Sequence, residues 1–203
     1  QGLMAAVRVW DPLVRTLHWT LVASILAAWI TGEMEKEAAQ RFHEWAGYAA
    51  LAIVALRLAW GLFGSRYARF PQFLRGPRAT LAYAGQVAAG REPRYLGHNP
   101  LGGWMIVALL VAVAGAGLSG WLMVTDRFWG VEWVEEVHEA LANTLFALAG
   151  LHVAGVVFTS LRHRENLVRA MLTGYKSAAP GAGIRVRHRL VGAVLLAAVV
   201  SFW

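Results

Sequence analysis

The sequence predicts an all-α integral membrane protein: a four-helix bundle with a cytoplasmic N-terminus and an additional short apolar helix at its C-terminal end. Apolar residues make up 58% of the 203 residues and charged residues only 15%, against about 45–50% and about 25% in soluble domains. Long uncharged runs separate the charged residues, and basic residues concentrate in alternate connecting segments. These observations exclude a disordered chain, a disulfide scaffold and an ordinary cytosolic enzyme.

Four runs with little or no charge are long enough to cross a bilayer, which takes about 20 mostly apolar residues in a helix. They are residues 16–32, 45–65 (interrupted by Arg57 alone), 95–125 (continuously apolar or small over 101–124) and 140–161. We expect the first run to be a retained span rather than a cleaved signal. Trp29 is bulky, and acidic residues begin at Glu33, where a cleavage site needs small residues.

A fifth apolar run covers residues 190–203. As a helix it would extend over only about 21 Å, which is short for a span. It is either a tilted span, a shortened one or a docking element. The oligomeric state therefore stays open, and a homodimer is one possibility. We expect one membrane domain over residues 1–176, followed by a basic linker and this short segment over 177–203.

The charges predict the orientation of the chain. The N-terminal segment, the loop 66–94, the tail from Arg162 and Arg57 together carry 16 Lys/Arg and three Asp/Glu. Segments 33–44 and 126–139 carry three Lys/Arg and nine Asp/Glu. Because cytoplasmic loops hold the Lys/Arg excess, we expect the N-terminus inside and the acidic loops outside. The net charge of +7 then reflects topology and attraction to lipid headgroups, and nucleic acid is not an expected partner.

The loop between the second and third spans contains several prolines and glycines. Within it, residues 74–86 could form a short helix at the membrane interface, with Arg75 and Arg78 toward the headgroups.

Four histidines lie in or at the ends of the expected spans, where an ionisable side chain suggests function. His138 and His152 are 14 residues apart, which places them on one side of a helix and about 21 Å apart along it. With the spans alternating in direction, His43 and His138 share the outer level, and His18 and His152 share the inner level. Facing imidazoles suit an iron with two axial ligands, and without cysteine a haem would be bound noncovalently. The pairs therefore predict two stacked b haems.

Each of these features has a simpler interpretation when taken alone. A single histidine at a helix end is usually interfacial or hydrogen-bonded. Six glycines could make room for a porphyrin, or they could only allow helices to pack closely: Gly47, Gly115, Gly117, Gly120, Gly150 and Gly155. Arg57 lies 14 residues after His43, so it could pair with the propionates of the inner haem, or it could extend to the inner interface.

Four short motifs together resemble the bacterial di-haem cytochrome b561 family, which is related to the cytochrome b subunits of nickel–iron hydrogenases. They are RTLHW at 15–19, RFHEWAG at 41–47, VHEAL at 137–141 and GLH at 150–152. The resemblance extends over about residues 7–176. The segment GHNPLGG at 97–103 is similar to one branch of the family, some members of which work with soluble periplasmic c-type cytochromes.

The resemblance implies a multi-pass electron carrier in the bacterial cytoplasmic membrane. It would contain two haem b groups, with His43 and His138 as axial ligands of the outer iron and His18 and His152 as those of the inner iron. Electrons would pass between the quinone pool and a redox partner at the outer face, either a c-type cytochrome or a partner subunit of a membrane complex. His98 could contact a propionate or a quinone, or simply belong to the turn that starts the third span. No catalytic residue is assigned.

Three other functions remain open at this point. Some relatives oxidise superoxide and pass the electron to quinone, but the three basic residues of the outer segments lie among nine acids. A transporter for zinc or copper ions could use paired histidines, although tetrahedral zinc needs further ligands. A passive anchor for a larger complex would keep haem for structure alone. The outer acids Asp126, Glu132, Glu135 and Glu136 could steer a basic cytochrome, or they could merely be solvated.

Overall fold

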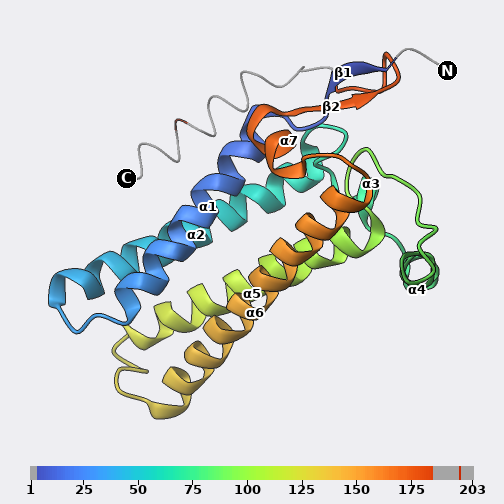
Figure 1. Ribbon diagram of the computed structural model, residues 1–203. Helices are drawn as coiled ribbons and strands as arrows, with labels where there is room; N and C mark the ends of the chain where they lie inside the picture. Colours follow the sequence, from blue (N-terminus) through green and yellow to red (C-terminus); the bar gives the residue numbers. More distant parts are fainter. Residues whose placement is uncertain (1–3, 185–196, 198–203) are drawn as a thin grey trace. The chain divides into compact units, whose positions relative to one another are not determined.

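Helices dominate the part of the chain described by this computed structural model, residues 4–184 and 197 (Figure 1). In chain order the elements are β1 (Ala5–Arg8), α1 (Pro12–Gly32), α2 (Glu37–Phe63), α3 (Phe70–Phe73), α4 (Pro77–Ala88), α5 (Pro100–Met123), α6 (Glu132–Arg162), α7 (Leu167–Thr173) and β2 (Tyr175–Ala178). The short segment expected over 190–203 lies outside the described residues, apart from the single residue 197.

The predicted all-α membrane class is confirmed. Four helices, α1, α2, α5 and α6, are long and apolar enough to cross a membrane, with 21, 27, 24 and 31 residues. Both α2 and α6 begin before the uncharged runs that predicted them, because their first turns contain acidic residues such as Glu37 and Glu132. Negative charge in the first turn of a helix is stabilising, so these acids extend the helices toward the aqueous phase.

The chain divides into two compact units. One contains residues 16–58 and 108–150 and is called the helical unit here. The other contains the remaining described residues up to 184 and is called the terminal unit. Each long helix contributes to both units, and each unit is described by itself.

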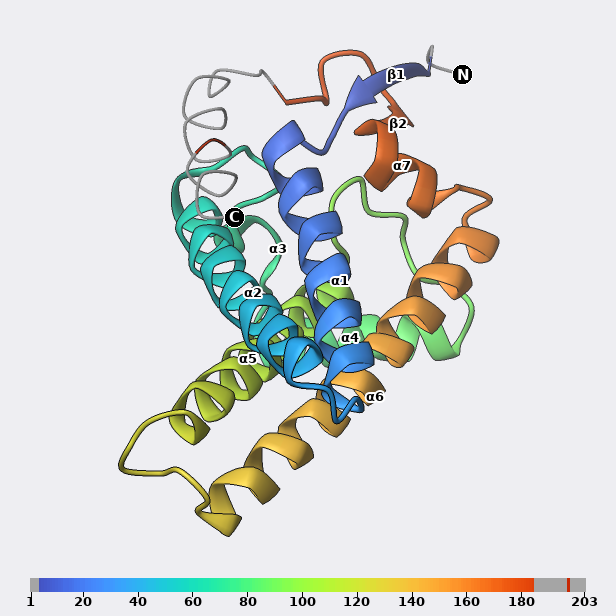
Figure 2. The ribbon, with the colours of Figure 1, turned by 90° about the vertical axis from the view of Figure 1, so that its left-hand side faces the viewer.

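In the helical unit, α1 and α2 form one antiparallel hairpin and α5 and α6 another (Figure 2). Glycines on α5 permit close helix packing. A Cβ atom at Gly117 would lie 2.6 Å from the Leu51 side chain on α2, and one at Gly115 would lie 3.3 Å from Leu141 on α6. Small residues at helix interfaces are typical of membrane bundles, so these two glycines serve packing.

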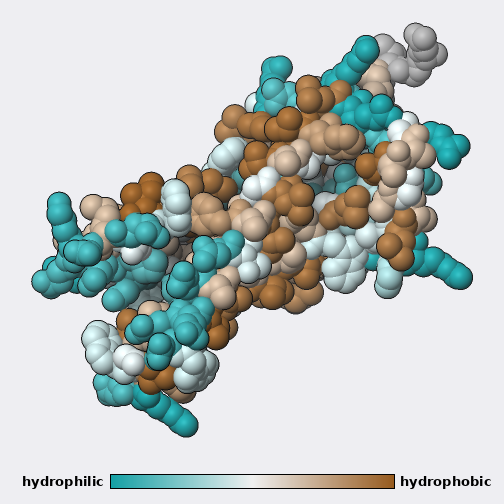
Figure 3. All heavy atoms as spheres, turned by 60° about the horizontal axis from the view of Figure 1, so that its bottom comes forward, coloured by the Kyte–Doolittle hydropathy of each residue, from teal (hydrophilic) through white to brown (hydrophobic). Residues whose placement is uncertain are grey.

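Large apolar side chains point away from these helices. Leu26 and Ile30 on α1, Leu118 on α5 and Leu151 on α6 are each 46–60% exposed. On the face drawn in Figure 3, apolar side chains lie along the helices and hydrophilic side chains gather toward helix ends. Such a surface suits lipid tails along the helix sides and water at the ends, and the chain is a membrane protein in contact with lipid.

The terminal unit contains a two-stranded antiparallel sheet that the sequence did not predict. Strands β1 and β2 pair with Ala5 opposite Ala178 and Arg8 opposite Tyr175. Gly174 directly precedes β2, caps α7 in a left-handed conformation (φ +88°) and accepts backbone hydrogen bonds from Val9 and Trp10. Each strand has only four residues, too few for an alternating pattern to be recognised.

The start of α1 belongs to the same unit and is fixed by Asp11. One carboxylate oxygen accepts from the backbone amide of Val14, 2.9 Å away, which caps the helix at the residue before Pro12. The other oxygen accepts from the indole of Trp60, 3.0 Å away, and from the hydroxyl of Ser65. The buried Asp11 thereby joins the start of α1 to the end of α2.

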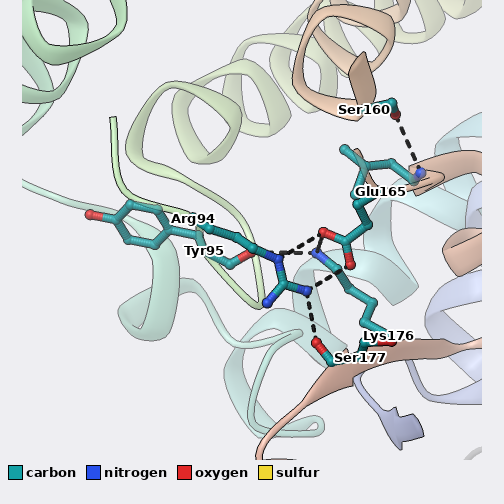
Figure 4. A network of polar contacts seen from close by, with 7 residues as sticks. Arg94, Tyr95, Ser160, Glu165, Lys176 and Ser177 are labelled. Atoms are coloured by element: carbon teal, nitrogen blue, oxygen red, sulfur yellow. Dashed lines mark hydrogen bonds and ion pairs between the residues drawn. The ribbon is translucent and has the colours of Figure 1, made fainter. Parts of the chain in front are cut away.

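A polar network ties the loop after α4 to the end of α6 and to β2 (Figure 4). Glu165 accepts from Arg94 at 2.9 Å and pairs with Lys176 at 3.2 Å. Arg94 also donates to the carbonyl oxygen of Ser177, and Lys176 donates to that of Tyr95. Burial lowers the pKa of Lys176, and the adjacent Glu165 carboxylate partly offsets this effect.

The helix predicted over 74–86 is present as α4, which begins at Pro77 and ends at Ala88, and its position at the membrane interface stays a prediction. It starts later than expected because Gly76 is the N-cap residue and Pro77 occupies the first helical position. Arg75 precedes the helix, and Tyr83 is the residue of α4 that is buried.

Candidate paired-histidine site

The two histidines expected at the outer level lie together in the helical unit. The ring centroids of His43 on α2 and His138 on α6 are 6.0 Å apart, and the ring planes are inclined by 79°. Both side chains are partly buried. The structure therefore brings together two residues that are 95 positions apart in the sequence.

Backbone carbonyls orient both rings. Nδ1 of His43 lies 2.6 Å from the carbonyl oxygen of Ala28 on α1. Nδ1 of His138 lies 2.9 Å from the carbonyl oxygen of Ala116 on α5 and 3.1 Å from Oγ of Ser119. A carbonyl oxygen can only accept, so Nδ1 carries a hydrogen in each ring, and Nε2 is the nitrogen through which a neutral ring would bind a metal. A hydrogen bond of this kind fixes the tautomer and orientation of a metal-binding histidine.

Two glycines make room for the rings. A Cβ atom at Gly32 on α1 would lie 3.0 Å from Nδ1 of His43, and one at Gly120 on α5 would lie 3.0 Å from Cε1 of His138. By contrast, a Cβ atom at Gly47, Gly150 or Gly155 would meet nothing within 4 Å. None of these three glycines is therefore required for close helix packing among the described residues, and their role in making space for a porphyrin stays a prediction.

The spacing of the two rings fits an iron between them. A metal–imidazole bond is about 2.0 Å long, and the ring centre lies roughly 1 Å beyond the bonded nitrogen, so opposed ligands have centroids about 6 Å apart. The observed 6.0 Å leaves room for one metal atom between the rings, and His43 and His138 are the residues that would hold it. All four helices contribute to the site, two through the imidazoles and two through the carbonyls.

The sequence could not identify Ala28, Ala116 and Ser119 as second-sphere partners of these histidines. A backbone carbonyl carries no side-chain signal, and serine within a helix usually bonds its own backbone. Ser119 does so as well, donating to the carbonyl of Ala116 at 3.0 Å. The sequence shows glycines at positions 32 and 120, but it does not predict that they lie beside the histidine rings, because this depends on how each helix is rotated about its axis.

The expected inner pair is distributed over the two units. His18 on α1 belongs to the helical unit, where its ring packs edge-to-face on Trp19 at 4.9 Å. His152 on α6 belongs to the terminal unit. Their pairing stays a prediction from depth and spacing.

Arg57 lies on α2 in the helical unit and is only 9% exposed. A side chain extended to the interface would leave the guanidinium in solvent, so burial favours an internal role for this cation. Its pairing with a haem propionate stays a prediction.

His98 lies in an aromatic cluster of the terminal unit. Its ring centroid is 4.6 Å from that of Trp10 and 4.9 Å from that of Phe73. The next residue, Asn99, accepts a hydrogen bond from the backbone amide of Gly102 at 2.7 Å and so starts α5 before Pro100. The helix-start interpretation of this segment is confirmed, and a contact of His98 with a propionate or quinone stays a prediction.

A transition-metal site with a full protein ligand set is not found in the described part of the chain. Residues 4–184 contain no group of three or more His, Cys, Asp or Glu side chains that could hold a metal ion. The paired imidazoles supply two ligands, which suits a metal whose remaining positions are filled by a macrocycle.

These features define the class of the protein: a helical membrane protein with two neighbouring, carbonyl-oriented imidazoles inside its bundle. The family model of prokaryotic cytochrome b561 matches residues 9–174, and the chain belongs to this family. Membership implies b-type haem binding and membrane-bound electron transfer. Comparisons with curated proteins and with solved structures gave no significant match.

Proposed function

We propose that this protein carries electrons across the bacterial cytoplasmic membrane through two b-type haems, between the quinone pool and a redox partner at the outer face. The observation that carries the proposal is the His43–His138 pair, with ring centroids 6.0 Å apart and both Nδ1 atoms held by carbonyls. When bound, haem iron supplies reversible one-electron redox chemistry.

The roles of the residues follow from their chemistry. His43 and His138 would hold the outer haem, and His18 and His152 the inner one. The carbonyls of Ala28 and Ala116 keep each outer imidazole in one tautomer, so the ligands need no reorientation. Fixed ligands also limit structural change between oxidation states.

The outer partner would be a basic protein, such as a c-type cytochrome, or a subunit of a membrane complex. The acids Asp126, Glu132, Glu135 and Glu136 are exposed, and none of the four forms an ion pair with the described residues. Unpaired exposed acids give a negative field that raises the encounter rate with a positively charged partner. The proposed orientation, with the N-terminus in the cytoplasm, places this field outside.

The alternatives have less support. Superoxide is an anion and would be repelled by the same acids. A metal-ion transporter would need further protein ligands near the histidines, and the described residues contain no such group. The metal-ion transporter remains an outcome of the experiment below.

The first test is a dithionite-reduced minus oxidised spectrum of the purified protein, with haem counted per chain by pyridine haemochromogen. We expect two b haems. His138→Ala should lose the outer haem and keep the inner, and His152→Ala should do the reverse. A wild-type protein without haem but with bound zinc or copper would contradict the proposal, and a variant that loses neither haem would contradict the pairing.

A further inference from the structure

The end of α6 has an unusual backbone conformation. Arg164 has φ +49° and is the only non-glycine residue at positive φ in the described part of the chain. It follows the last turn of α6, where Glu165 donates to the carbonyl of Ser160 and Arg164 to that of Leu161. This hydrogen-bond pattern usually places glycine at the left-handed position. A side chain there is retained at an energetic cost, which suggests that it has a use.

Arg164 lines a shallow, open groove of about 400 Å³ together with Phe158, Leu161 and Arg162. Phe158 and Leu161 are 50% and 75% exposed on the final turns of a membrane-spanning helix. The groove therefore combines a wall that faces lipid tails with two guanidinium groups at the end of the span. The apolar wall suits the acyl chain of a phospholipid, and the guanidinium groups at the end of the span suit its phosphate.

The two arginines differ in their available charge. Arg162 donates to the carboxylate of Glu92 at 2.9 Å and to the carbonyl of Gly90, so its charge is already matched and its position fixed. The guanidinium of Arg164 makes no hydrogen bond or ion pair with the side chains and backbone that the structure describes, and the residue is exposed. One unmatched cation beside an apolar wall is complementary to a lipid that carries one negative charge.

Helix α7, which follows the groove in the chain, also exposes apolar side chains together with an arginine. Val168 and Leu172, four residues apart on α7, are 48% and 57% exposed, and Arg169 between them is exposed as well. Residues four apart share one face of a helix. Short helices with apolar residues and arginine on their exposed surface lie at membrane interfaces.

From this geometry we infer that the groove formed by Phe158, Leu161, Arg162 and Arg164 binds one anionic phospholipid, with its phosphate at Arg164 and an acyl chain along Phe158 and Leu161. The ligand would be a monoanionic phosphodiester lipid such as phosphatidylglycerol. This inference concerns lipid binding and does not depend on the haem assignments.

The test uses the purified full chain in detergent and counts bound lipid by native mass spectrometry. Phosphatidylglycerol and phosphatidylcholine with the same acyl chains are compared at equal concentration. We expect one retained phosphatidylglycerol and weaker retention of phosphatidylcholine. Arg164→Gln should weaken retention of phosphatidylglycerol about fivefold, the effect typical of one interfacial cation. Lys36→Gln removes an equal charge from the exposed acidic segment between α1 and α2, outside the unit that holds the groove, and should leave retention unchanged.

Arg164→Gly separates lipid binding from folding. Glycine relieves the left-handed backbone, so this variant should unfold at an equal or higher temperature without lipid. Added phosphatidylglycerol should raise the unfolding temperature of the wild type and not that of Arg164→Gly, because a ligand stabilises only the fold that binds it. Glycerol phosphate should stabilise neither protein, since it lacks the acyl chain.

Three results would overturn the inference. Equal retention of phosphatidylglycerol and phosphatidylcholine would show that the groove does not distinguish lipids by their charge. Equal losses in Lys36→Gln and Arg164→Gln would show that net charge, rather than the groove, sets lipid retention. Full stabilisation by glycerol phosphate would show a site for free phosphate esters.

Discussion

At the scale of single residues, Gly120 decides whether the His138 ring can adopt its position. A Cβ atom there would lie 3.0 Å from Cε1 of the ring, closer than ordinary van der Waals contact. We expect Gly120→Ala to displace the imidazole and reduce the outer haem content, measured as haem per chain, while the inner haem is retained. Gly85→Ala on α4 is the matched control, because a Cβ atom at Gly85 meets nothing within 4 Å. Unchanged haem content in Gly120→Ala would contradict the site geometry.

Arg57 is the second residue whose role can be measured. A buried cation near a haem favours the reduced form, which carries one positive charge fewer than the oxidised form. Arg57→Leu should therefore lower the midpoint potential of the inner haem, on the order of 50 mV, if the lost interaction is roughly 1 kcal/mol. Redox titration followed at the haem absorption band measures this shift. Arg57→Lys keeps the charge and should recover most of the potential, whereas equal potentials in all three proteins would remove the propionate role.

At the scale of elements, the ion pair between Glu92 and Arg162 connects the loop after α4 to the end of α6. The pKa of Glu92 is held below its usual value by a hydrogen bond from its own backbone amide and by the Arg162 guanidinium. A depressed carboxyl pKa stabilises the fold above the unfolded-state pKa, and the contribution is lost as pH falls through the folded-state pKa.

Thermal unfolding in detergent between pH 7 and pH 3 tests this linkage. Wild-type stability should fall below about pH 4.5, the ordinary glutamate pKa. Glu92→Gln should be less stable at pH 7 and should show a shallower fall in acid, because it has no proton to gain there. Parallel curves for the two proteins would mean that other carboxyl groups govern the acid response.

Glu165 holds a second connection between elements, since it contacts both Arg94 and the buried Lys176. Removing one partner of a buried pair leaves an uncompensated charge, which typically costs about 3–5 kcal/mol. Lys176 is 2% exposed and Glu165 16% exposed in their side chains, so the lower end of that range applies. We expect Glu165→Gln to lower the unfolding temperature by several degrees at pH 7, with Arg75→Gln, an exposed residue before α4, as a neutral control. Equal unfolding temperatures would show that Lys176 finds another partner.

At the scale of the whole molecule, the sequence predicts what depends on composition and periodicity. Uncharged runs predicted four spans because a bilayer requires about 20 apolar residues wherever the chain crosses it. The 14-residue spacing of His138 and His152 predicted that the two side chains lie on one side of a helix and at different depths in the membrane. Because successive spans run in opposite directions, His43 was then expected at the same depth as His138. The distance of 6.0 Å between the two ring centroids agrees with that reasoning.

Features that depend on tertiary contact could not be predicted. The carbonyls of Ala28 and Ala116 became partners of the histidines through helix rotation, which hydropathy does not specify. The β1–β2 sheet forms because α7 and Gly174 return the chain to the N-terminal segment, and four-residue strands leave no periodic signal. The left-handed Arg164 also escapes prediction, because sequence preference favours glycine there.

The field at the outer loops is the property of the whole molecule that decides partner choice under the proposed function. The triple variant Glu132→Gln, Glu135→Gln and Glu136→Gln removes three exposed negative charges from the first turns of α6. At low ionic strength we expect its electron exchange with a basic c-type cytochrome to slow about tenfold, because steering acts on the encounter rate. In stopped-flow measurements the rates of the wild type and the triple variant should converge as salt is added, because mobile ions screen the field over about 10 Å at 0.1 M. A difference that persists at high salt would assign these glutamates to direct contact, and no difference at low salt would mean that the acids are only solvated and that the partner docks elsewhere.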